Sequence, residues 1–299
     1  MQIGYIGLGK MGKNMALRLI EKGHDVIAWN RSPDPRKEVA AAGAVTAETV
    51  EELVSKLQGP KIVWVMLPAG QPTIDMITKL SVLLTAGDII IDGANSFYKN
   101  TLKCAELLTD KGIKFIDAGV SGGPTGARNG ACVMIGGDEP SFKSLEPLFA
   151  DISNAGAYCF FRGHGAGHFA KMVHNGIEYG MMQAIGEGFE VLKKSSYDYD
   201  LQQVAELYQA QSVIESRLVG WLVSGYQKHG NDLEGISGSV AHSGEGQWTI
   251  ETAKEYGIPT PVISASLNFR VSSTDHPSYT GQVVSTLRNE FGGHDVKKK

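Results

Sequence analysis

The sequence predicts an α/β Rossmann domain, with a doubly wound and mostly parallel sheet, followed by an all-helical domain. Two observations predict the first part: a glycine-rich turn, Gly7–Gly12, follows an apolar strand, and strand and helix patterns then alternate. A third observation predicts the second part. No strand pattern follows Gly163, where a stretch of more than twenty residues without proline begins. We therefore expect two domains, residues 1–164 and 165–299.

Length and composition limit the class of protein. The chain has 299 residues, 42% of them hydrophobic and 20% charged, which is typical of a soluble globular protein. A net charge of −4 gives no indication of a nucleic-acid or membrane surface. Three widely spaced cysteines without a CxxC pair predict a reducing compartment, no metal site and cysteines buried in the core. With no signal peptide and no long apolar run, we expect a cytoplasmic protein.

The first strand, turn and helix have the order of a dinucleotide-binding unit. A strand is expected at Gln2–Ile6, a helix at Asn14–Lys22 and a second strand at Asp25–Trp29. Between the first two, the glycines allow a tight turn, close approach of a diphosphate and close helix packing. The helix N-terminus supplies N–H donors for that diphosphate. The turn residues predicted to bind the cofactor are Gly7, Leu8, Gly9, Lys10, Met11 and Gly12.

The end of the second strand indicates which nicotinamide cofactor is used. A carboxylate there would bind the ribose 2′-hydroxyl of NAD. This chain has Asn30, Arg31 and Ser32 instead, and a guanidinium with a hydroxyl can bind a 2′-phosphate. We predict NADP as the cofactor, with NAD as the alternative. The alternative interpretation is that Arg31 is only a solvated loop residue and does not bind the cofactor.

The remaining part of the first domain repeats the alternation. Helices are expected at 48–57, 71–84, 101–111 and 140–150, and strands at 61–67, 88–92, 114–118, 131–135 and 158–161. Ligands bind beyond the carboxyl ends of such strands. Leu67 and Pro68, Asn95, and the turn Ser121-Gly122-Gly123 occupy those places, so we expect them to face the cofactor crevice. A plain loop is the alternative for Ser121–Gly123.

The second domain begins with a long helix that carries four different polar groups on one side. Further helices are expected at 201–211, 214–227, 249–256, 261–273 and 281–290. On the first helix, 167–194, an amine, an imidazole, an amide and a carboxylate fall within about 100° of the circumference: Lys171, His174, Asn175 and Glu178. Apolar or small residues take the other side: Phe169, Met172, Val173, Gly176, Gly180 and Ala184. A solvated polar face is the ordinary interpretation. The mixed chemistry and the nucleotide-binding turn favour a functional face.

With these motifs, the chain resembles the decarboxylating 6-phosphogluconate dehydrogenase family, specifically its short bacterial form, within the β-hydroxyacid dehydrogenase superfamily. The resemblance runs along essentially the full length. Its most specific part is the long-helix motif GAGHFAKMVHNGIEYGMMQ (Gly165–Gln183). The other motifs are IGLGKMG (Ile6–Gly12), IIIDGANSFY (Ile89–Tyr98), DAGVSGGPTGARNG (Asp117–Gly130), SGEGQWT (Ser243–Thr249) and RNEFGGH (Arg288–His294).

The resemblance implies oxidation and decarboxylation of 6-phosphogluconate to ribulose 5-phosphate and CO2. It implies that Lys171 is the acid/base at the 3-hydroxyl and that Glu178 protonates the carbon that becomes C1. Residues implied at the carboxylate and hydroxyls are Asn95, which also borders the cofactor, Ser121, Gly122, Gly123, His174 and Asn175. Those implied at the phosphate are Tyr179, Arg270, Arg288 and His294. The last two lie on a tail that reaches the neighbouring subunit in the family, which implies a homodimer or homotetramer.

Several residues depart from the family pattern. Ser243 stands where the long form has a phosphate-binding lysine, so the phosphate must depend more on the arginines. Many short forms have aspartate at the place of Asn30 and prefer NAD. Two alternatives remain, a β-hydroxyacid dehydrogenase for a small substrate such as 3-hydroxyisobutyrate, and a non-catalytic NADP-binding protein. The sugar-phosphate motifs weigh against the first, and the presence of both Lys171 and Glu178 weighs against the second.

Overall fold

The computed structural model describes residues 1–242 and 244–293. They form two compact units, which divide between Met172 and Val173, inside the long helix α8 (Ala166–Lys194). The helix predicted at 167–194 is present and begins one residue earlier than predicted. Ser243 and His294, both named above for the phosphate site, lie outside the described residues.

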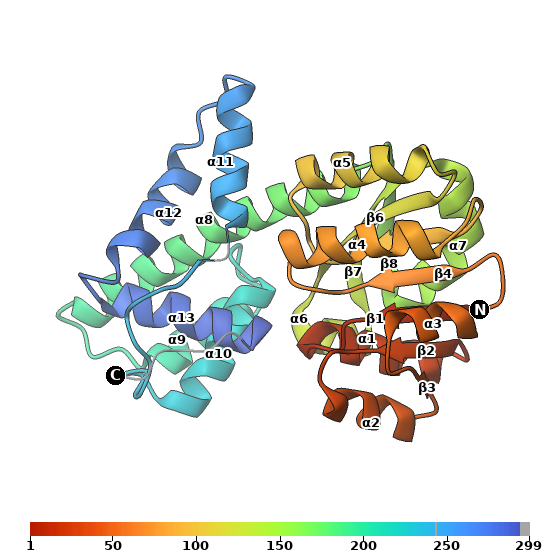
Figure 1. The fold of residues 1–299 in the computed structure, drawn as a ribbon. Coiled ribbons are helices and arrows are strands. Elements are labelled where there is room, and N and C mark those ends of the chain that lie inside the picture. Colours follow the sequence, from red (N-terminus) through yellow and green to blue (C-terminus); the bar gives the residue numbers. More distant parts are fainter. Residues whose placement is uncertain (243, 294–299) are drawn as a thin grey trace. The chain divides into compact units, whose positions relative to one another are not determined.

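The first unit is built on one eight-stranded sheet with the order β3-β2-β1-β4-β5-β6-β7-β8 (Figure 1). The strands are β1 (Gln2–Ile6), β2 (Asp25–Trp29), β3 (Val45–Thr46), β4 (Ile62–Val65), β5 (Ile89–Asp92), β6 (Lys114–Ser121), β7 (Ala131–Gly137) and β8 (Ser153–Arg162). Every neighbouring pair is parallel except β6 and β7. The predicted doubly wound, mostly parallel sheet is confirmed.

Helices cover both faces of this sheet. They are α1 (Lys10–Glu21), α2 (Pro33–Ala41), α3 (Val50–Lys56), α4 (Gln71–Leu83), α5 (Tyr98–Thr109), α6 (Gly123–Asn129) and α7 (Glu139–Ile152). Alternate residues of β4 enter two different cores: Trp64 packs with the cluster under α1 and α7, and Val63 packs with the cluster under α3, α4 and α5. A strand buried on both faces reads as a continuous apolar run, which is why the sequence pattern identified it.

Three elements were not predicted, namely α2, α6 and β3, and strands β6, β7 and β8 are longer than the ranges predicted for them. Helix α2 opens with Pro33-Asp34-Pro35, which looks like a turn, although proline fits the first turn of a helix. Helix α6 is short and starts in a glycine-rich stretch. Strand β6 continues to Ser121 because Gly119–Ser121 pair with the antiparallel strand β7. The turn predicted at these residues is therefore partly strand. Strand β3, the third element that was not predicted, pairs with β2 over only two residues.

The cysteines only partly follow the prediction that they are core residues. Cys104 is buried in α5, but Cys132 and Cys159 are exposed. Cys159 lies on β8, the last strand in the sheet order, and strand β8 has no strand neighbour on its outer side. Its residues are therefore mostly exposed despite their apolar sequence.

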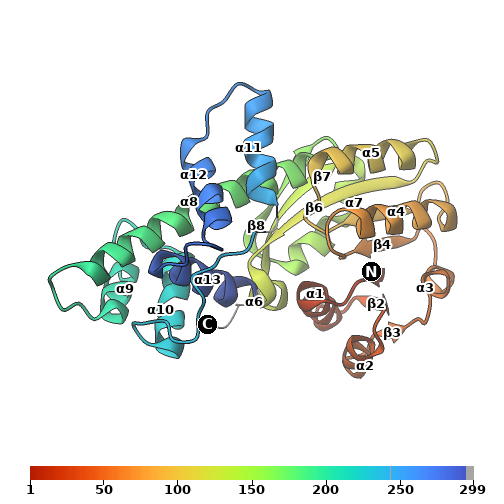
Figure 2. The ribbon, with the colours of Figure 1, turned by 60° about the vertical axis from the view of Figure 1, so that its left-hand side comes forward.

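The second unit contains only helices among its described residues, as predicted. After α8 come α9 (Leu201–Gln209), α10 (Arg217–His229), α11 (Glu245–Glu255), α12 (Pro261–Ser272) and α13 (Tyr279–Gly292). Helix α10 packs against both α9 and α13 (Figure 2). Ten consecutive residues of α13, Tyr279–Arg288, are buried, so this helix runs through the core of the unit. None of the helices in the described ranges is long and apolar enough to cross a membrane.

Candidate active site

The glycine-rich turn in the first unit leaves space for a diphosphate. Gly7 has φ +98°, and an added Cβ would lie 2.3 Å from the Met66 carbonyl oxygen. At Gly12 an added Cβ would lie 2.0 Å from the Gly7 carbonyl oxygen, so α1 packs directly on the turn. Gly9, in contrast, has nothing within 4 Å of an added Cβ, and it begins α1 without a side-chain cap. An open approach to uncapped N–H groups is what a dinucleotide diphosphate requires.

Asn30 connects this turn to the end of β2. Its Oδ1 accepts a hydrogen bond from the Leu8 N–H at 2.9 Å, and its Nδ2 donates to the Ser32 carbonyl at 3.1 Å. Arg31 and Ser32 are exposed beside it. The amide of Asn30 thus organises the loop, while the neighbouring guanidinium and hydroxyl remain accessible from solvent. This arrangement fits a cofactor that carries a 2′-phosphate, because no carboxylate stands at the strand end.

Asn95 holds the ends of β5 and β6 together. It has φ +52°, a conformation that asparagine adopts more readily than most residues. Its Oδ1 accepts from the Val120 N–H at 2.8 Å, and its Nδ2 donates to the Val120 carbonyl at 3.2 Å. The predicted residues Ser121, Gly122 and Gly123 follow directly, where β6 ends and α6 begins. The predicted cofactor neighbour Leu67 lies against Gly7, 2.9 Å from its added Cβ, and exposed Pro68 follows it.

Three glycines let the start of α8 lie directly on strands β6 and β7. An added Cβ on Gly119 would lie 2.3 Å from the Cβ of Lys171. On Gly136 it would lie 2.5 Å from the Gly167 nitrogen, and on Gly167 it would lie 2.5 Å from the Met134 carbonyl oxygen. Lys171 is consequently only 6% exposed, although the sequence pattern placed it on a polar helix face. The stem of Lys171 crosses β6 near its carboxyl end.

A buried polar cluster anchors the same helix start. The carboxylate of Asp117 accepts hydrogen bonds from the N–H groups of Gly165 and His168, at 2.7 and 2.8 Å. The His168 Nδ1 is 2.8 Å from the Thr101 hydroxyl and 4.0 Å from the Asp92 carboxylate, and burial raises the pKa of Asp92. Sequence reasoning missed this cluster. The signal available in the sequence was one aspartate in each of two otherwise apolar strands, Asp92 in β5 and Asp117 in β6.

In the second unit, α8 brings three of the predicted polar residues together. The His174 Nδ1 lies 3.0 Å from the Asn175 Oδ1 and 3.8 Å from the Glu178 carboxylate. All three side chains are partly exposed. Lys171 precedes them on the same helix, so the four residues keep the helical spacing that the sequence predicted.

Helix α8 in this unit also faces a pair of buried arginines. Arg270, on α12, is 2% exposed, and Arg288, on α13, is 8% exposed. The Arg270 guanidinium carbon lies 3.4 Å from the centre of the Tyr179 ring, a cation–π contact, and its Nη2 is 4.0 Å from the Met182 sulfur. The Tyr179 hydroxyl is buried and has no hydrogen-bond partner among the described residues. We call Tyr179, Arg270 and Arg288 the arginine cluster.

The electrostatics of the arginine cluster favour an anion. Burial, together with the neighbouring charge of Arg288, lowers the pKa of Arg270 to about 10, against opposing effects of Tyr179, Glu178 and Glu245. Burial also lowers the pKa of Arg288. Within the described residues, no carboxylate forms an ion pair with either guanidinium. Two buried like charges are costly unless an anion joins them, so the cluster is suited to bind one.

The resemblance implied that Arg288 lies on a tail that reaches a neighbouring subunit. In the structure it lies in α13, and its electrostatic partners Tyr179, Glu178 and Glu245 belong to the same unit. The reason is that α13 runs through the core and carries Arg288 into its own cluster. Sequence reasoning also missed Glu245 and Gly246, which open α11 beside Tyr179.

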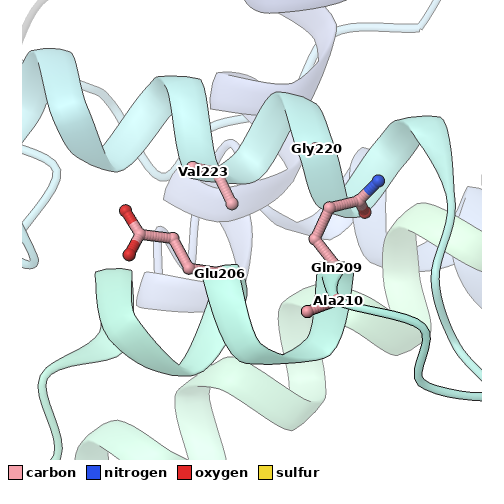
Figure 3. A pocket seen from close by; sticks show the side chains of 5 residues that line it. All are labelled: Glu206, Gln209, Ala210, Gly220 and Val223. Carbon is pink, nitrogen blue, oxygen red and sulfur yellow. The ribbon is translucent and has the colours of Figure 1, made fainter.

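A separate hollow lies between α9 and α10 and belongs to neither group of site residues (Figure 3). Its volume is about 360 Å³. It is lined by Glu206, Gln209 and Ala210 of α9 and by Gly220 and Val223 of α10. None of the predicted site residues lines it.

Comparison with known proteins shows the family of the chain. The family model for the NAD binding domain of 6-phosphogluconate dehydrogenase matches residues 2–164, and that for the 6-phosphogluconate dehydrogenase C-terminal domain matches residues 167–296. A Bacillus subtilis protein, YqeC, named provisionally as a 6-phosphogluconate dehydrogenase, is 45% identical over the full length of both chains. The NAD(+)-dependent, decarboxylating 6-phosphogluconate dehydrogenase of Haloferax volcanii is 36% identical, over 100% of this chain and 99% of that one.

Solved structures show the same fold. The Plasmodium falciparum 6-phosphogluconate dehydrogenase is 30% identical with a TM-score of 0.81, and its structures include complexes with NADP+ and with 6-phosphogluconate. The match covers 92% of this chain but only 62% of that longer one. Mycobacterium tuberculosis 3-hydroxyisobutyrate dehydrogenase, at 23% identity and a TM-score of 0.72, shares the fold over 96% of this chain and 99% of its own. This chain is an NAD(P)-binding oxidoreductase that belongs to the 6-phosphogluconate dehydrogenase family, in its short form.

Proposed function

We propose that the protein oxidises and decarboxylates 6-phospho-D-gluconate to D-ribulose 5-phosphate and CO2, with NADP as the electron acceptor. The observation that carries this proposal is the arginine cluster. Two buried guanidinium groups lie beside the helix that bears His174 and Glu178, and the buried Tyr179 hydroxyl of that helix has no partner in the part of the chain that the structure describes. A sugar phosphate would supply the anion that this cluster needs.

The cluster also argues against a small non-phosphorylated hydroxy acid as the substrate. Such a molecule has no phosphate that could form direct ion pairs with the buried Arg270 and Arg288. The likeness to 3-hydroxyisobutyrate dehydrogenase concerns the fold alone, because the identity is only 23%.

In the proposed reaction Lys171 and Glu178 divide the proton transfers. Lys171 accepts the proton of the substrate 3-hydroxyl as C3 is oxidised. The bound nicotinamide supplies the acceptor for the hydride from C3. The resulting 3-keto acid loses its carboxylate as CO2, the electron pair of the broken bond forms an enediolate, and Lys171 returns a proton to O3. Glu178 then protonates the carbon that becomes C1 of the product while Lys171 takes back the proton of O3, which leaves the ketone of ribulose 5-phosphate.

The spacing of the two groups on α8 supports this division. Lys171 and Glu178 are seven residues apart on one continuous helix, an axial rise of about 10 Å. Two groups at this spacing can serve different carbons of an extended sugar acid. We assign Asn95, Ser121, Gly122, Gly123, His174 and Asn175 to the carboxylate and hydroxyls. Tyr179, Arg270 and Arg288 we assign to the phosphate.

A direct assay tests the reaction. Purified protein with 6-phosphogluconate and NADP should release CO2 and produce reduced nicotinamide, whereas 3-hydroxyisobutyrate should give neither. Lys171→Met should lower kcat by about 10²- to 10⁴-fold, the range for loss of a general acid/base, and leave NADP affinity unchanged. Full activity of this variant would remove Lys171 from its role, and turnover of 3-hydroxyisobutyrate alone would overturn the proposed substrate.

The preference for NADP rests on the end of β2. Arg31 and Ser32 are exposed there and Asn30 replaces a carboxylate, whereas the Haloferax volcanii relative is named as NAD(+)-dependent. We expect kcat/KM to be higher with NADP than with NAD. Arg31→Gln should lower the value for NADP about tenfold, one bidentate phosphate contact, and leave the value for NAD unchanged. A higher kcat/KM with NAD in the unmodified protein would reverse the proposal.

We also propose a domain boundary and an oligomeric state. We assign residues 1–164 to cofactor binding, and 165–299 to substrate binding and oligomerisation. We propose a homodimer or homotetramer in which the segment containing His294 completes a neighbouring site. Light scattering of the purified protein would test the oligomer, and a monomeric active enzyme would exclude it.

A further inference from the structure

The buried polar cluster at the start of α8 contains groups that none of the proposed proton transfers uses. Its imidazole, His168, is 1% exposed, and its two carboxylates, Asp92 and Asp117, are 1% and 0% exposed. The three residues come from α8, β5 and β6, and all lie in the first compact unit. The cluster therefore joins three segments that are far apart in the sequence.

Asp92, the last residue of β5, shapes the loop that carries Asn95. Its Oδ1 accepts a hydrogen bond from the Ala94 N–H at 3.0 Å, and its Oδ2 accepts one from the Ser96 hydroxyl at 2.9 Å. Ala94 and Ser96 flank Asn95, whose φ of +52° is a conformation that few residues other than glycine adopt. One buried carboxylate thus holds the loop on both sides of Asn95.

His168 connects this carboxylate to α8. Its Nδ1 lies 2.8 Å from the Thr101 hydroxyl and 4.0 Å from the Asp92 Oδ2, the oxygen that also accepts from Ser96. Its Nε2 is buried and has no hydrogen-bond partner among the residues that the structure describes, so polar contacts hold the ring from the Nδ1 side. Because a displaced ring would leave its Nδ1 buried without a partner as well, the imidazole and the Asp92 loop constrain each other.

Lys171 follows His168 by three residues on α8, so both residues lie on the same side of the helix. Strand β6 fixes that side at two points. The Asp117 carboxylate accepts from the His168 N–H at 2.8 Å, and Gly119 leaves the space that the Cβ of Lys171 occupies. A movement of the helix start that displaces His168 therefore displaces Lys171 as well.

We propose that His168 and Asp92 are positioning residues that hold Asn95 and Lys171 in one fixed arrangement. The pair joins the loop after β5, which we assign to the substrate, to the helical turn that bears the acid/base. This deepens the proposed function and rests on it for the roles of Asn95 and Lys171. His168 and Asp92 transfer no proton to the substrate and act through the residues that they hold.

Removal of the imidazole tests this role in turnover. His168→Leu keeps a side chain of similar size and should lower kcat about 10- to 100-fold, the effect of a displacement of up to about 1 Å. The value is taken per cofactor site, counted by NADP titration, so that loss of folded protein cannot imitate the result. His168→Asn places an amide near the position of Nδ1 and should stay within about fivefold of the unmodified protein, the size of one hydrogen bond. The matched control is His164→Leu, which replaces an imidazole that lies beside the Phe115 ring, and it should leave kcat unchanged.

Hydrogen exchange, followed by mass spectrometry, tests the connection without any turnover. In His168→Leu the loop 93–98 should exchange about fivefold faster, although the substitution is on another element, and Asp92→Asn should have the same effect on residues 165–171. Thr101→Val is a milder variant that removes only the partner of Nδ1, and it should speed exchange in both segments. Its control is Thr109→Val on the same helix, because the Thr109 hydroxyl donates only to the Ala105 carbonyl. If His168→Leu does not fold, this pair of variants decides the matter.

Each outcome has a distinct meaning. Faster exchange confined to the substituted element would show that the loop and the helix are independent, and would overturn the inference. A kcat per site in His168→Leu equal to that of His164→Leu would overturn it too. His168→Asn as slow as His168→Leu would mean that the shape of the ring, not its polar contact, places Lys171, which also contradicts the inference. If exchange changes as expected but the unmodified protein does not turn over 6-phosphogluconate, the proposed function fails and the connection between loop and helix stands.

Discussion

Lys171 and Arg270 are both buried basic residues, but the two units hold them by different means. Lys171 is placed by shape: glycines of β6, β7 and α8 remove the side chains that would keep the helix away. Arg270 is placed by chemistry: a tyrosine ring, a methionine sulfur and nearby carboxylates surround a charge that has no direct ion pair within the described residues. The difference indicates which substitutions each region can tolerate.

A position fixed by shape should respond to a single methyl group, whereas a position fixed by charge should respond to the loss of that charge. In the first region the atoms in the way are backbone or the start of a side chain, which have no room to move. In the second, the buried guanidinium is stable only with compensation from its surroundings. Three substitutions test this contrast, in order of expected effect.

Arg270→Gln should have the largest effect, on substrate binding. Removal of one partner from a buried charged contact costs about 2 to 5 kcal/mol, so KM for 6-phosphogluconate should rise by roughly 30- to 5000-fold. The affinity for NADP should not change, because the cofactor residues are in the other unit. Initial-rate kinetics and cofactor titration measure both. An unchanged KM would exclude the arginine cluster as the phosphate site.

Gly119→Ala should have the next largest effect, on the chemical step. The new Cβ would lie 2.3 Å from the Lys171 Cβ, so the lysine must shift, and a displacement of about 1 Å can lower kcat by about 10²-fold. Cofactor affinity should be retained. Gly188→Ala is the matched control, since nothing lies within 4 Å of that Cβ on α8 and alanine favours helix. Equal kcat values for the two variants would contradict the role of Gly119 in placing Lys171.

Glu190→Gln should have the smallest effect, on stability. Burial opposes ionisation of Glu190, but hydrogen bonds from Lys194 and Thr280 outweigh it and lower the pKa to about 2. The carboxylate accepts from the Thr280 N–H at 2.9 Å, which joins α8 to α13. Because the folded pKa lies below the ordinary value of 4.5, the stabilisation is present above about pH 4.5 and is lost as the pH falls towards 2.

We expect Glu190→Gln to lower the free energy of unfolding by about 1 to 2 kcal/mol at pH 7 and to flatten its dependence on pH between 4.5 and 2. Urea unfolding at several pH values measures this. Glu206→Gln is the control, because Glu206 is exposed and accepts a single hydrogen bond from Gln202. A loss of the same size in the control would mean that Glu190 contributes nothing specific.

Local sequence signals were sufficient for most of the fold. The Gly7–Gly12 turn, the buried strand β4 and the helix α8 each follow from the spacing of apolar and small residues along one segment. The pattern did not extend to β6, where Gly119–Ser121 look like a turn. Those residues become strand because β7 pairs with them, and a pairing partner is not visible in the segment itself.

The candidate site was also predictable from the sequence only in part. Helical spacing grouped Lys171, His174, Asn175 and Glu178, and the family resemblance added Tyr179, Arg270 and Arg288. They did not show that Lys171 is buried, that Arg288 stays in its own unit, or that Glu245 stands beside the arginines. Each of these depends on which surface a helix packs against, and contacts between distant segments are not encoded in local periodicity.

The sequence by itself thus determined the order of the elements, the cofactor turn and the chemical types of the site residues, because these depend on neighbours a few positions apart. Only the tertiary structure decided how deep Lys171 lies and what surrounds Arg270. The depth depends on Gly119, 52 positions before the lysine, meeting it across a strand without a side chain between them. The surroundings depend on α8, α11, α12 and α13 meeting at one buried charge, where burial and Coulomb interactions set the balance.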